Sequence, residues 1–260
     1  MTDINEKSEM DASDRPRGIY LLPNLLTTAA LFSAFYSVVA ALKGNFDLAA
    51  MAIFASMIAD GLDGRVARMT NTQTAFGAQY DSLSDMVAFG VAPALVVYSW
   101  SLIHLGKMGW LVSFIYAAAT ALRLARFNSQ IDHPDKNYFQ GLPCTAAAPV
   151  IAGMVWLGGT YDINGFYIAI PAAVLTFLLG ACMVSSIRYY SFKHLDLRGR
   201  VSFIVGFLFV LMLAGVAVAP APVLFFMAFT YAISGPIMTL WQLRKMRKQK
   251  RKSTLGNVRS

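Results

Sequence analysis

The sequence predicts an all-α integral membrane protein, a polytopic helical bundle with about eight transmembrane helices. Of its 260 residues, 57% are hydrophobic and only 14% are charged, and the mean hydropathy is +0.52. A water-soluble domain would expose more charge than this. The apolar runs are long and do not alternate with polar residues, which argues against a transmembrane β-barrel. Composition therefore favours membrane-spanning helices.

Eight apolar segments, each near the ~20 residues that a bilayer requires, are the predicted helices. They span residues 20–42, 46–68, 78–103, 109–127, 143–159, 165–187, 201–219 and 222–243. Short polar or Gly- and Pro-containing links separate them. We expect three parts in the chain: a disordered cytoplasmic tail over 1–17, one membrane-embedded domain over 18–243, and a basic cytoplasmic tail over 244–260.

Positive charges predict the orientation of these helices. If both termini are cytoplasmic, the outer links contain only Lys43 and Lys107, and every other Lys and Arg faces the cytoplasm. Eight of the 22 basic residues lie between Arg244 and Arg259, with no aromatic residue among them. Such a tail after an apolar helix favours contact with anionic lipid rather than nucleic acid. We therefore expect a protein of the inner (cytoplasmic) membrane, with membrane lipids and no nucleic acid as partners.

Four carboxylates fall within the second and third predicted helices: Asp60, Asp63, Asp81 and Asp85. The first two are three residues apart and the last two are four apart, so each pair lies on one helical face. Clustered negative charge near hydrocarbon needs compensation. One or two hard divalent cations such as Mg²⁺ would supply it through oxygen ligands, and the lack of nearby His or Cys in the sequence argues against zinc.

Small residues are interleaved with these carboxylates. Gly64 and Ala67 share a face with the first pair, and Gly77 lies in the same row as the second pair. This arrangement leaves room for a diphosphate and a flat base. Arg68 offers a planar guanidinium to a phosphate. Small residues also mediate helix packing in membranes, but beside four carboxylates they favour a binding site.

The pattern Asp60-x-x-Asp63-Gly64-x-x-Ala67-Arg68, then eight residues, then Gly77-x-x-x-Asp81-x-x-x-Asp85 resembles the signature of the CDP-alcohol phosphotransferases. Members of this family are integral to membranes and use divalent metal to displace CMP from a CDP-linked lipid with an alcohol. The resemblance implies a homodimer and two bound Mg²⁺ or Mn²⁺ ions. It implies that Asp85 is a metal ligand and the general base, that Asp60, Asp63 and Asp81 are metal ligands, and that the cytidine diphosphate is bordered by Asn24, Asp60, Gly64, Ala67, Arg68 and Gly77.

The flanking segments 81–94, 121–130, 138–143 and 183–193 resemble the membrane-embedded phosphatidylserine synthases of that family. The similarity runs from about Gly18 to Lys193 and implies CDP-diacylglycerol and L-serine as substrates. One departure is visible after residues 141–143, where a Ser-Pro or similar pair is expected and Cys144-Thr145 is present. This departure lies outside the carboxylate pattern.

A serine acceptor would bring a carboxylate to a site already rich in phosphate, so the site needs additional cations and amide donors. We expect them at the cytoplasmic ends of the fourth and sixth predicted helices. The candidates for binding the acceptor or the lipid phosphate are Arg123, Arg126, Asn128, Arg188 and Lys193. Positive-inside anchoring is the alternative explanation for these charges, and Tyr189 and Tyr190 are expected at the membrane interface.

Two other functions stay open at this point. A sister transferase of the same fold would use glycerol 3-phosphate, choline or inositol as its acceptor. A cation transporter is a more distant alternative, because carboxylates within a membrane also mark ion paths. All four Asp lie near one predicted leaflet and none lies deeper, which argues against transport.

Overall fold

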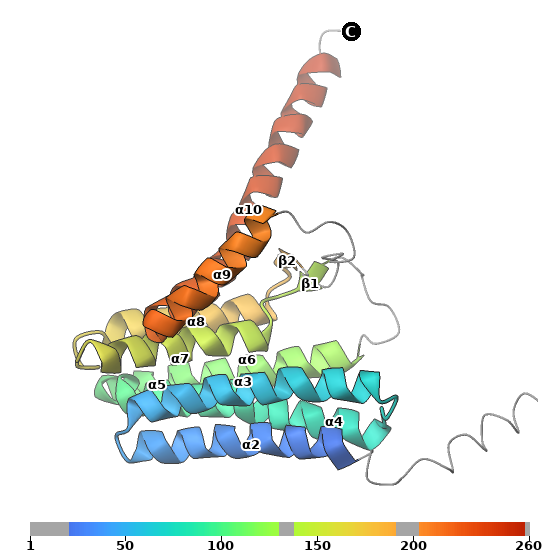
Figure 1. Ribbon diagram of the computed structural model, residues 1–260. Coiled ribbons are helices and arrows are strands. Elements are labelled where there is room, and N and C mark those ends of the chain that lie inside the picture. Colours follow the sequence, from blue (N-terminus) through green and yellow to red (C-terminus); the bar gives the residue numbers. More distant parts are fainter. Residues whose placement is uncertain (1–20, 130–137, 191–202, 258–260) are drawn as a thin grey trace, which may run out of the picture.

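The computed structural model describes residues 21–129, 138–190 and 203–257, and in this part of the chain it is a helical bundle with one small sheet (Figure 1). The elements are α2 (Leu21–Leu42), α3 (Phe46–Met69), α4 (Ala75–Asp85), the π-helix η2 (Met86–Val91), α5 (Ala92–Trp100), the 3-10 helix η3 (Leu102–Leu105), α6 (Lys107–Ser129), β1 (Tyr138–Gln140), α7 (Cys144–Thr160), α8 (Ala169–Val184), β2 (Arg188–Tyr190), α9 (Phe203–Val218) and α10 (Pro220–Asn257).

The predicted apolar helices are all present among the described residues. Helix α4, η2 and α5 follow one another without a break and together form the third predicted helix. Within the described ranges, four helices are long and apolar enough to cross a bilayer: α2, the unit Ala75–Trp100, α6 and the Pro220–Thr239 part of α10. Apolar but shorter helices are Cys144–Thr160, Ala169–Val184 and Gly206–Val218. The prediction of an α-helical membrane bundle is therefore confirmed at this level.

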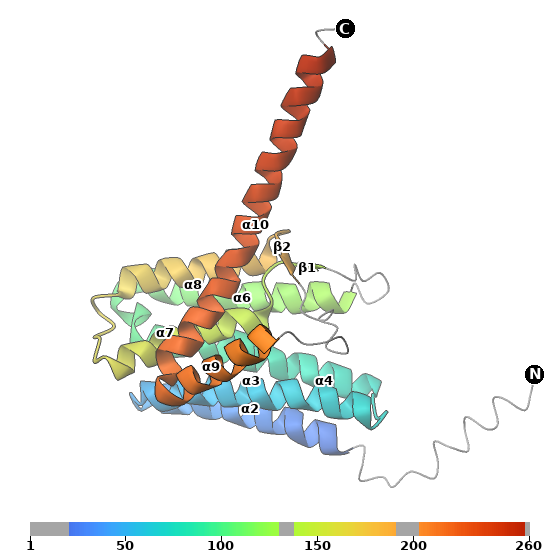
Figure 2. The same ribbon diagram turned by 45° about the horizontal axis from the view of Figure 1, so that its top comes forward.

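The last helix is longer than predicted. We expected it to end near residue 243, but α10 continues to Asn257. Residues 244–255 are mostly Arg, Lys, Gln, Met and Leu, which favour helix, and the first glycine comes only at Gly256. In Figures 1 and 2 this end of α10 projects away from the bundle. The tail predicted to be disordered, residues 1–17, lies outside the described residues.

The bundle is built on the α2–α3 pair, which has the most extensive contacts of any two elements. Both helices bury alanines completely, among them Ala34 and Ala49. Side chains this small let two helix backbones approach closely. The Ser56 hydroxyl of α3 also donates a hydrogen bond to the Ala30 carbonyl of α2, at 2.7 Å. The α2–α3 pair is therefore closely packed and holds the polar residues at its ends in place.

A short turn over residues 70–74 reverses the chain between α3 and α4. Asn71 has a φ of 50°, in the left-handed region that Asn tolerates better than most residues. Thr74 then caps α4, because its hydroxyl accepts a hydrogen bond of 3.0 Å from the Gly77 amide. The turn therefore brings the end of α3 alongside the beginning of α4.

The π-helix η2 begins directly after Asp85 and was not predicted from the sequence. The buried Tyr116 of α6 donates a hydrogen bond of 3.0 Å to the Phe89 carbonyl within it. Single π-helical turns inside α-helices are frequent near functional sites. Here the turn changes the helical phase between the last residue of α4 and the core-facing residues of α5.

The two short strands pair antiparallel, with Phe139 opposite Tyr189. The expectation that Tyr189 lies at the membrane interface is wrong, because its side chain is fully buried against α10. Its hydroxyl donates a hydrogen bond of 3.1 Å to the Ala232 carbonyl. Pro236 has no N–H to bond that carbonyl four residues earlier in the helix. The sheet is thereby anchored to α10 at the same end of the bundle as the α3–α4 turn (Figures 1 and 2).

Candidate active site

Three of the four predicted carboxylates form a compact cluster. Asp60 and Asp63 of α3 and Asp81 of α4 each offer an oxygen, and these atoms all lie within 4.8 Å of one another. Asp63 is buried, and one of its oxygens accepts a hydrogen bond of 2.6 Å from the Thr27 hydroxyl of α2. Clustered carboxylate oxygens are the donor set that hard divalent cations prefer. The cluster therefore fits a divalent metal ion.

The fourth carboxylate, Asp85, joins this cluster through Asp60. The two carboxyl groups lie within hydrogen-bond reach of each other. Two carboxylates this close repel unless a proton or a cation lies between them. The Oδ1 atom of Asp85 is buried and has no hydrogen-bond partner among the described residues. Asp85 thus has one oxygen facing the cluster residue Asp60 and a second oxygen available to a ligand.

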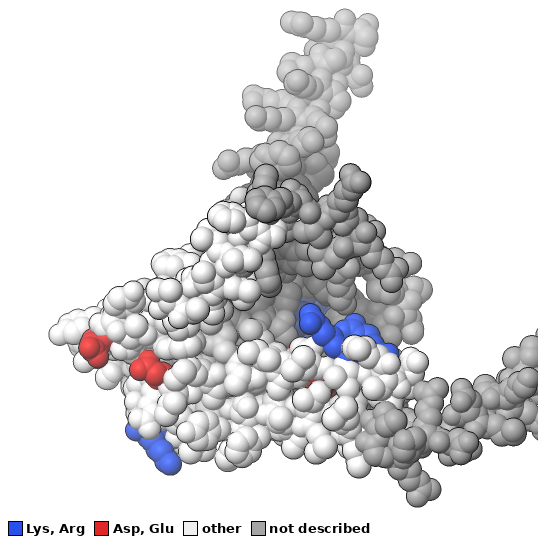
Figure 3. Space-filling view, viewed as in Figure 1, with Lys and Arg blue, Asp and Glu red and all other residues white. Residues whose placement is uncertain are grey.

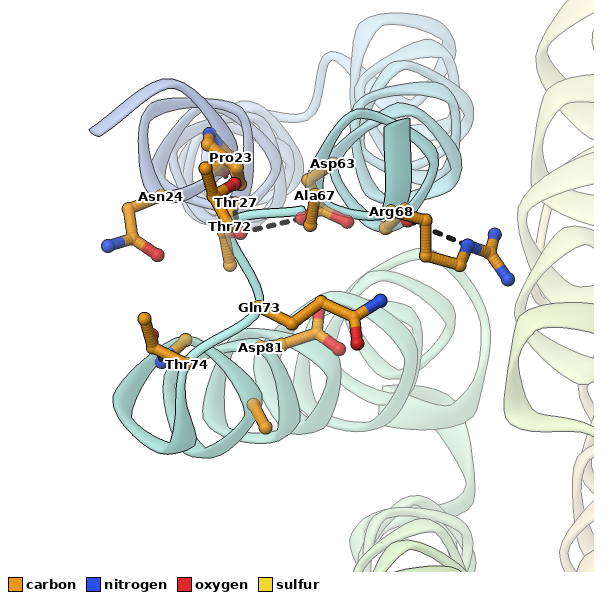
Figure 4. Close-up of a pocket in the computed structure, with 13 residues that line it drawn as sticks. Pro23, Asn24, Thr27, Asp63, Ala67, Arg68, Thr72, Gln73, Thr74 and Asp81 are labelled. Carbon is orange, nitrogen blue, oxygen red and sulfur yellow. Dashed lines mark hydrogen bonds between the residues drawn. The ribbon is translucent and has the colours of Figure 1, made fainter. Parts of the chain in front are cut away.

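A pocket of about 360 Å³ opens beside the cluster, between α2, α3 and α4 (Figure 4). Its lining contains Asp63 and Asp81 from the carboxylate cluster. It also contains every residue predicted to border the nucleotide except Asp60, namely Asn24, Gly64, Ala67, Arg68 and Gly77. Residues from three helices therefore converge on one volume, of the size that small ligands occupy.

The two pocket glycines have different surroundings. A Cβ at Gly64 would meet no protein atom within 4 Å, so the space beside it is open. A Cβ at Gly77 would lie 3.1 Å from the Thr74 hydroxyl and 3.4 Å from the Asn24 side-chain oxygen. Gly77 therefore permits close contact between α4 and its neighbours, whereas Gly64 keeps space free for a ligand.

Arg68 lies at the rim of the pocket. Its Nε donates a hydrogen bond of 2.9 Å to the Gly64 carbonyl one turn earlier in α3. In Figure 4 the guanidinium points away from Asp63 and Asp81. The Arg68 side chain is exposed, so its terminal nitrogens are accessible to a phosphate.

Several pocket residues were not predicted: Pro23, Thr27, Thr72, Gln73, Thr74 and Ala78. Thr27 follows Asn24 by three residues, so helical spacing from Asn24 could have identified it. The polar residues of the 70–74 turn carry no comparable signal. Their place in the pocket depends on the path of the turn between α3 and α4.

The predicted cations of the acceptor region have different environments. Arg123 of α6 is partly buried, and its Nη1 donates to the Cys144 sulfur of α7 at 3.1 Å. Arg126 donates to the carbonyls of Val184 and Met183 at the end of α8, at 3.2 and 3.3 Å. In Figure 3, Lys and Arg atoms gather at the end of the bundle where α3 and α6 end.

The remaining acceptor candidates contribute less to the described geometry. Asn128 is exposed and donates a hydrogen bond of 3.0 Å to the Ser82 hydroxyl of α4. Arg188 is paired with Gln140 in the sheet, but its side chain lies outside the described part of the structure. Lys193 lies outside the described residues altogether.

These features define a membrane-embedded helical bundle with a carboxylate cluster that could hold a metal ion, beside an open pocket. The sequence profile of the CDP-alcohol phosphatidyltransferase family matches residues 20–243, which includes the carboxylate cluster, the pocket, Arg123 and Arg126. The chain belongs to this family.

Individual relatives agree with this assignment. The chain is 37% identical over 236 residues to a CDP-diacylglycerol–serine O-phosphatidyltransferase of Helicobacter pylori strain 26695, covering 90% of this chain and 98% of that protein. It is 34% identical over 170 residues to an archaetidylserine synthase of Methanothermobacter thermautotrophicus, covering 65% of this chain and 69% of that protein. A CDP-diacylglycerol–serine O-phosphatidyltransferase of Methanocaldococcus jannaschii is 38% identical over 142 residues, which are 55% of this chain and 63% of that protein.

Proposed function

We propose that this chain is a phosphatidylserine synthase, which transfers the phosphatidyl group of CDP-diacylglycerol to the hydroxyl of L-serine and releases CMP. The observation that carries the proposal is the carboxylate cluster of α3 and α4 beside a pocket lined by the family's motif residues. The names of the relatives support the acceptor, because a relative matched over 98% of its length is a serine phosphatidyltransferase.

In this proposal the pocket between α2, α3 and α4 receives the cytidine diphosphate. Gly64 and Ala67 leave space for it, Asn24 and Gly77 border it, and Arg68 offers a guanidinium to a phosphate at the rim. Asp60, Asp63, Asp81 and Asp85 would hold divalent metal, Mg²⁺ or Mn²⁺, as two ions. Bound metal would offset negative charge on the transferred phosphate and on the leaving CMP.

Asp85 accepts the proton of the serine hydroxyl through its buried Oδ1. The serine oxygen then forms a bond to the phosphorus that carries diacylglycerol. The bond between this phosphorus and the bridging oxygen breaks, and CMP leaves with that oxygen. One displacement completes the transfer without a covalent enzyme intermediate.

The membrane arrangement follows from the same proposal. All eight helical units would cross the inner membrane, with both termini and the carboxylate cluster on the cytoplasmic side. The family resemblance also implies a homodimer, which a mass measurement on the detergent-solubilised protein would test. The acyl chains of CDP-diacylglycerol would remain in the bilayer.

Assay of the purified protein in mixed micelles tests the function. We expect CMP release from CDP-diacylglycerol only when L-serine and either Mg²⁺ or Mn²⁺ are present, and no release after chelation with EDTA. Faster turnover with glycerol 3-phosphate, inositol or choline would replace serine with that acceptor and leave the family chemistry intact. Ion flux in proteoliposomes without CMP release would instead favour a transporter.

A further inference from the structure

Arg123 lies where three helices meet, close to the catalytic carboxylates. It extends from α6 to the first residue of α7, Cys144, whose sulfur accepts its Nη1 hydrogen bond. Charges of Arg123, Asp85 and Asp60 all act on the Cys144 thiol, and Tyr231 of α10 also lies within range of the Arg123 charge. The lining of the nucleotide pocket contains neither Arg123 nor Cys144, so the guanidinium lies outside that pocket.

Arg123 has few partners for a partly buried cation. Its Nε is buried and has no hydrogen-bond partner among the described residues. The thiol of Cys144 is a weak acceptor for the strong donor at Nη1. Leaving a buried charged donor unpaired costs free energy, so a partner of opposite charge is expected there.

The unpaired nitrogen of Arg123 has a counterpart on Asp85. Four buried side-chain polar atoms lack a hydrogen-bond partner in the described part of the chain: Ser37 Oγ, Asp85 Oδ1, Arg123 Nε and Thr176 Oγ1. Only two of these belong to charged groups, and these two have opposite charge. Both groups lie near Cys144, since both charges act on its thiol. A ligand with a hydroxyl at one end and an anionic group at the other would satisfy both.

The neighbouring candidates are already engaged by the protein. Arg126, one turn further along α6, donates to two carbonyls at the end of α8. A Cβ at Gly141 would lie 2.8 Å from the Arg126 Nη2, so this glycine makes room for the arginine in that position. Asn128 donates to Ser82. Arg126 therefore joins α6 to α8, whereas Arg123 retains donors for a ligand.

We infer that Arg123 binds the carboxylate of the amino-acid acceptor while Asp85 faces the acceptor hydroxyl, and that Arg126 is a structural residue. This inference rests on the proposed function. Nε and the terminal nitrogen that Cys144 does not bind form a fork that matches two carboxylate oxygens. The lipid phosphate is an alternative oxyanion for the same fork. Arg68 lines the nucleotide pocket, which favours assigning the phosphate to that pocket.

The kinetic constants of Arg123→Gln distinguish the serine carboxylate from the lipid phosphate as the anion that Arg123 binds. We expect the KM for L-serine to rise by about ten- to a hundredfold, the factor expected when charge-assisted hydrogen bonds are lost. The KM for CDP-diacylglycerol should remain close to the wild-type value. The preference for L-serine over ethanolamine, which lacks the carboxylate, should fall by a similar factor. A raised KM for CDP-diacylglycerol with an unchanged KM for L-serine would overturn the inference.

Matched variants keep the inference testable. Lys107→Gln removes an exposed positive charge from the other end of α6 and should leave both KM values unchanged. Arg123→Lys keeps the charge but not the fork, so it should fold even if Arg123→Gln does not, and its KM for L-serine should still rise. A wild-type KM in Arg123→Lys would contradict the inference. If the wild-type protein releases CMP with another acceptor but not with L-serine, the proposed function is contradicted instead.

Discussion

The two regions beside the carboxylate cluster, which we propose as its nucleotide side and its acceptor side, are built in different ways. On the nucleotide side, the end of α3, a short turn and the beginning of α4 supply most of the pocket, and α2 supplies the rest. On the acceptor side, Arg123 of α6 meets Cys144 of α7, with Tyr231 of α10 nearby. The first side comes mainly from one continuous segment, and the second combines residues far apart in the sequence.

Because of this difference, the residues of the first side are easier to group from the sequence than those of the second. Helical spacing places neighbours three or four residues apart on one face, so Asp60, Asp63 and Gly64 can be grouped from the sequence. Arg123 and Arg126 are also three residues apart, yet their partners differ completely. Spacing alone does not distinguish a ligand-binding arginine from a structural one, because the distinction lies in the helices that face them.

The largest effect is expected at the residue where the two sides meet. Asp85→Asn should reduce CMP release by about 10²–10⁴-fold, the range expected for loss of a general base, while CDP-diacylglycerol still binds. Turnover and thermal stabilisation by CDP-diacylglycerol measure the two properties separately. Asp47→Asn, at the exposed beginning of α3, is the control and should turn over normally. Wild-type turnover in Asp85→Asn would remove this residue from the base role.

On the nucleotide side, a larger side chain at Gly64 should block the pocket without disturbing the protein. Gly64→Leu adds atoms where no protein atom lies within 4 Å of a Cβ. We expect the KM for CDP-diacylglycerol to rise by about tenfold or more, because a good part of the ligand contact is lost, with no loss of thermal stability. Gly61→Leu is a matched control, since Gly61 is equally open but does not line the pocket. Equal kinetics in the two variants would mean that the pocket does not hold the nucleotide.

On the acceptor side, Arg126→Gln should affect stability rather than serine binding. The carbonyls of Met183 and Val184 would lose a charged donor, and such bonds contribute about 1.5–3 kcal/mol. We expect a melting temperature several degrees lower and an unchanged KM for L-serine in the folded fraction. Arg65→Gln, at an exposed position of α3, provides the thermal control. A raised KM for L-serine in Arg126→Gln would show that both arginines bind the acceptor.

The smallest effect is expected where the sheet is anchored to α10. Burial raises the pKa of the Tyr189 phenol above its usual range, so its hydroxyl stays protonated and donates to the Ala232 carbonyl. Tyr189→Phe removes this bond and should lower the free energy of unfolding by about 0.5–1.5 kcal/mol. Tyr161→Phe, at an exposed tyrosine, should leave it unchanged. Equal melting temperatures for the two variants would show that the bond does not stabilise the sheet.

The helical framework was largely predictable, because long apolar runs have few alternatives to helix in a membrane. The end of α10 was not predictable from hydropathy, which marks only where an apolar span ends. The residues beyond that span also favour helix, so the helix continues. The π-helix η2 was also missed, because it depends on packing between Phe89 and Tyr116 and leaves no pattern in the sequence.

Part of the site was predictable for a similar reason. Asn24, Gly64 and Gly77 were expected beside one ligand, and they line one pocket. The turn residues Thr72, Gln73 and Thr74 were missed, because a turn has no periodicity to indicate which side chains face the pocket. Tyr189 was predicted at the membrane interface because tyrosines are common there. In the structure its ring fits beside Gly235, which has no side chain, and its hydroxyl bonds to the Ala232 carbonyl, so it is buried.

The sequence by itself determined the membrane bundle, the pairing of carboxylates and the small residues beside them, because hydropathy and helical spacing are local properties of the chain. Only the tertiary structure decided that Asp85 reaches Asp60, that Arg126 is held by α8, and that Arg123 keeps an unpaired nitrogen near the cluster. These relations depend on how separate helices face one another. Contacts of this kind are set by packing across the bundle, which one-dimensional spacing does not contain.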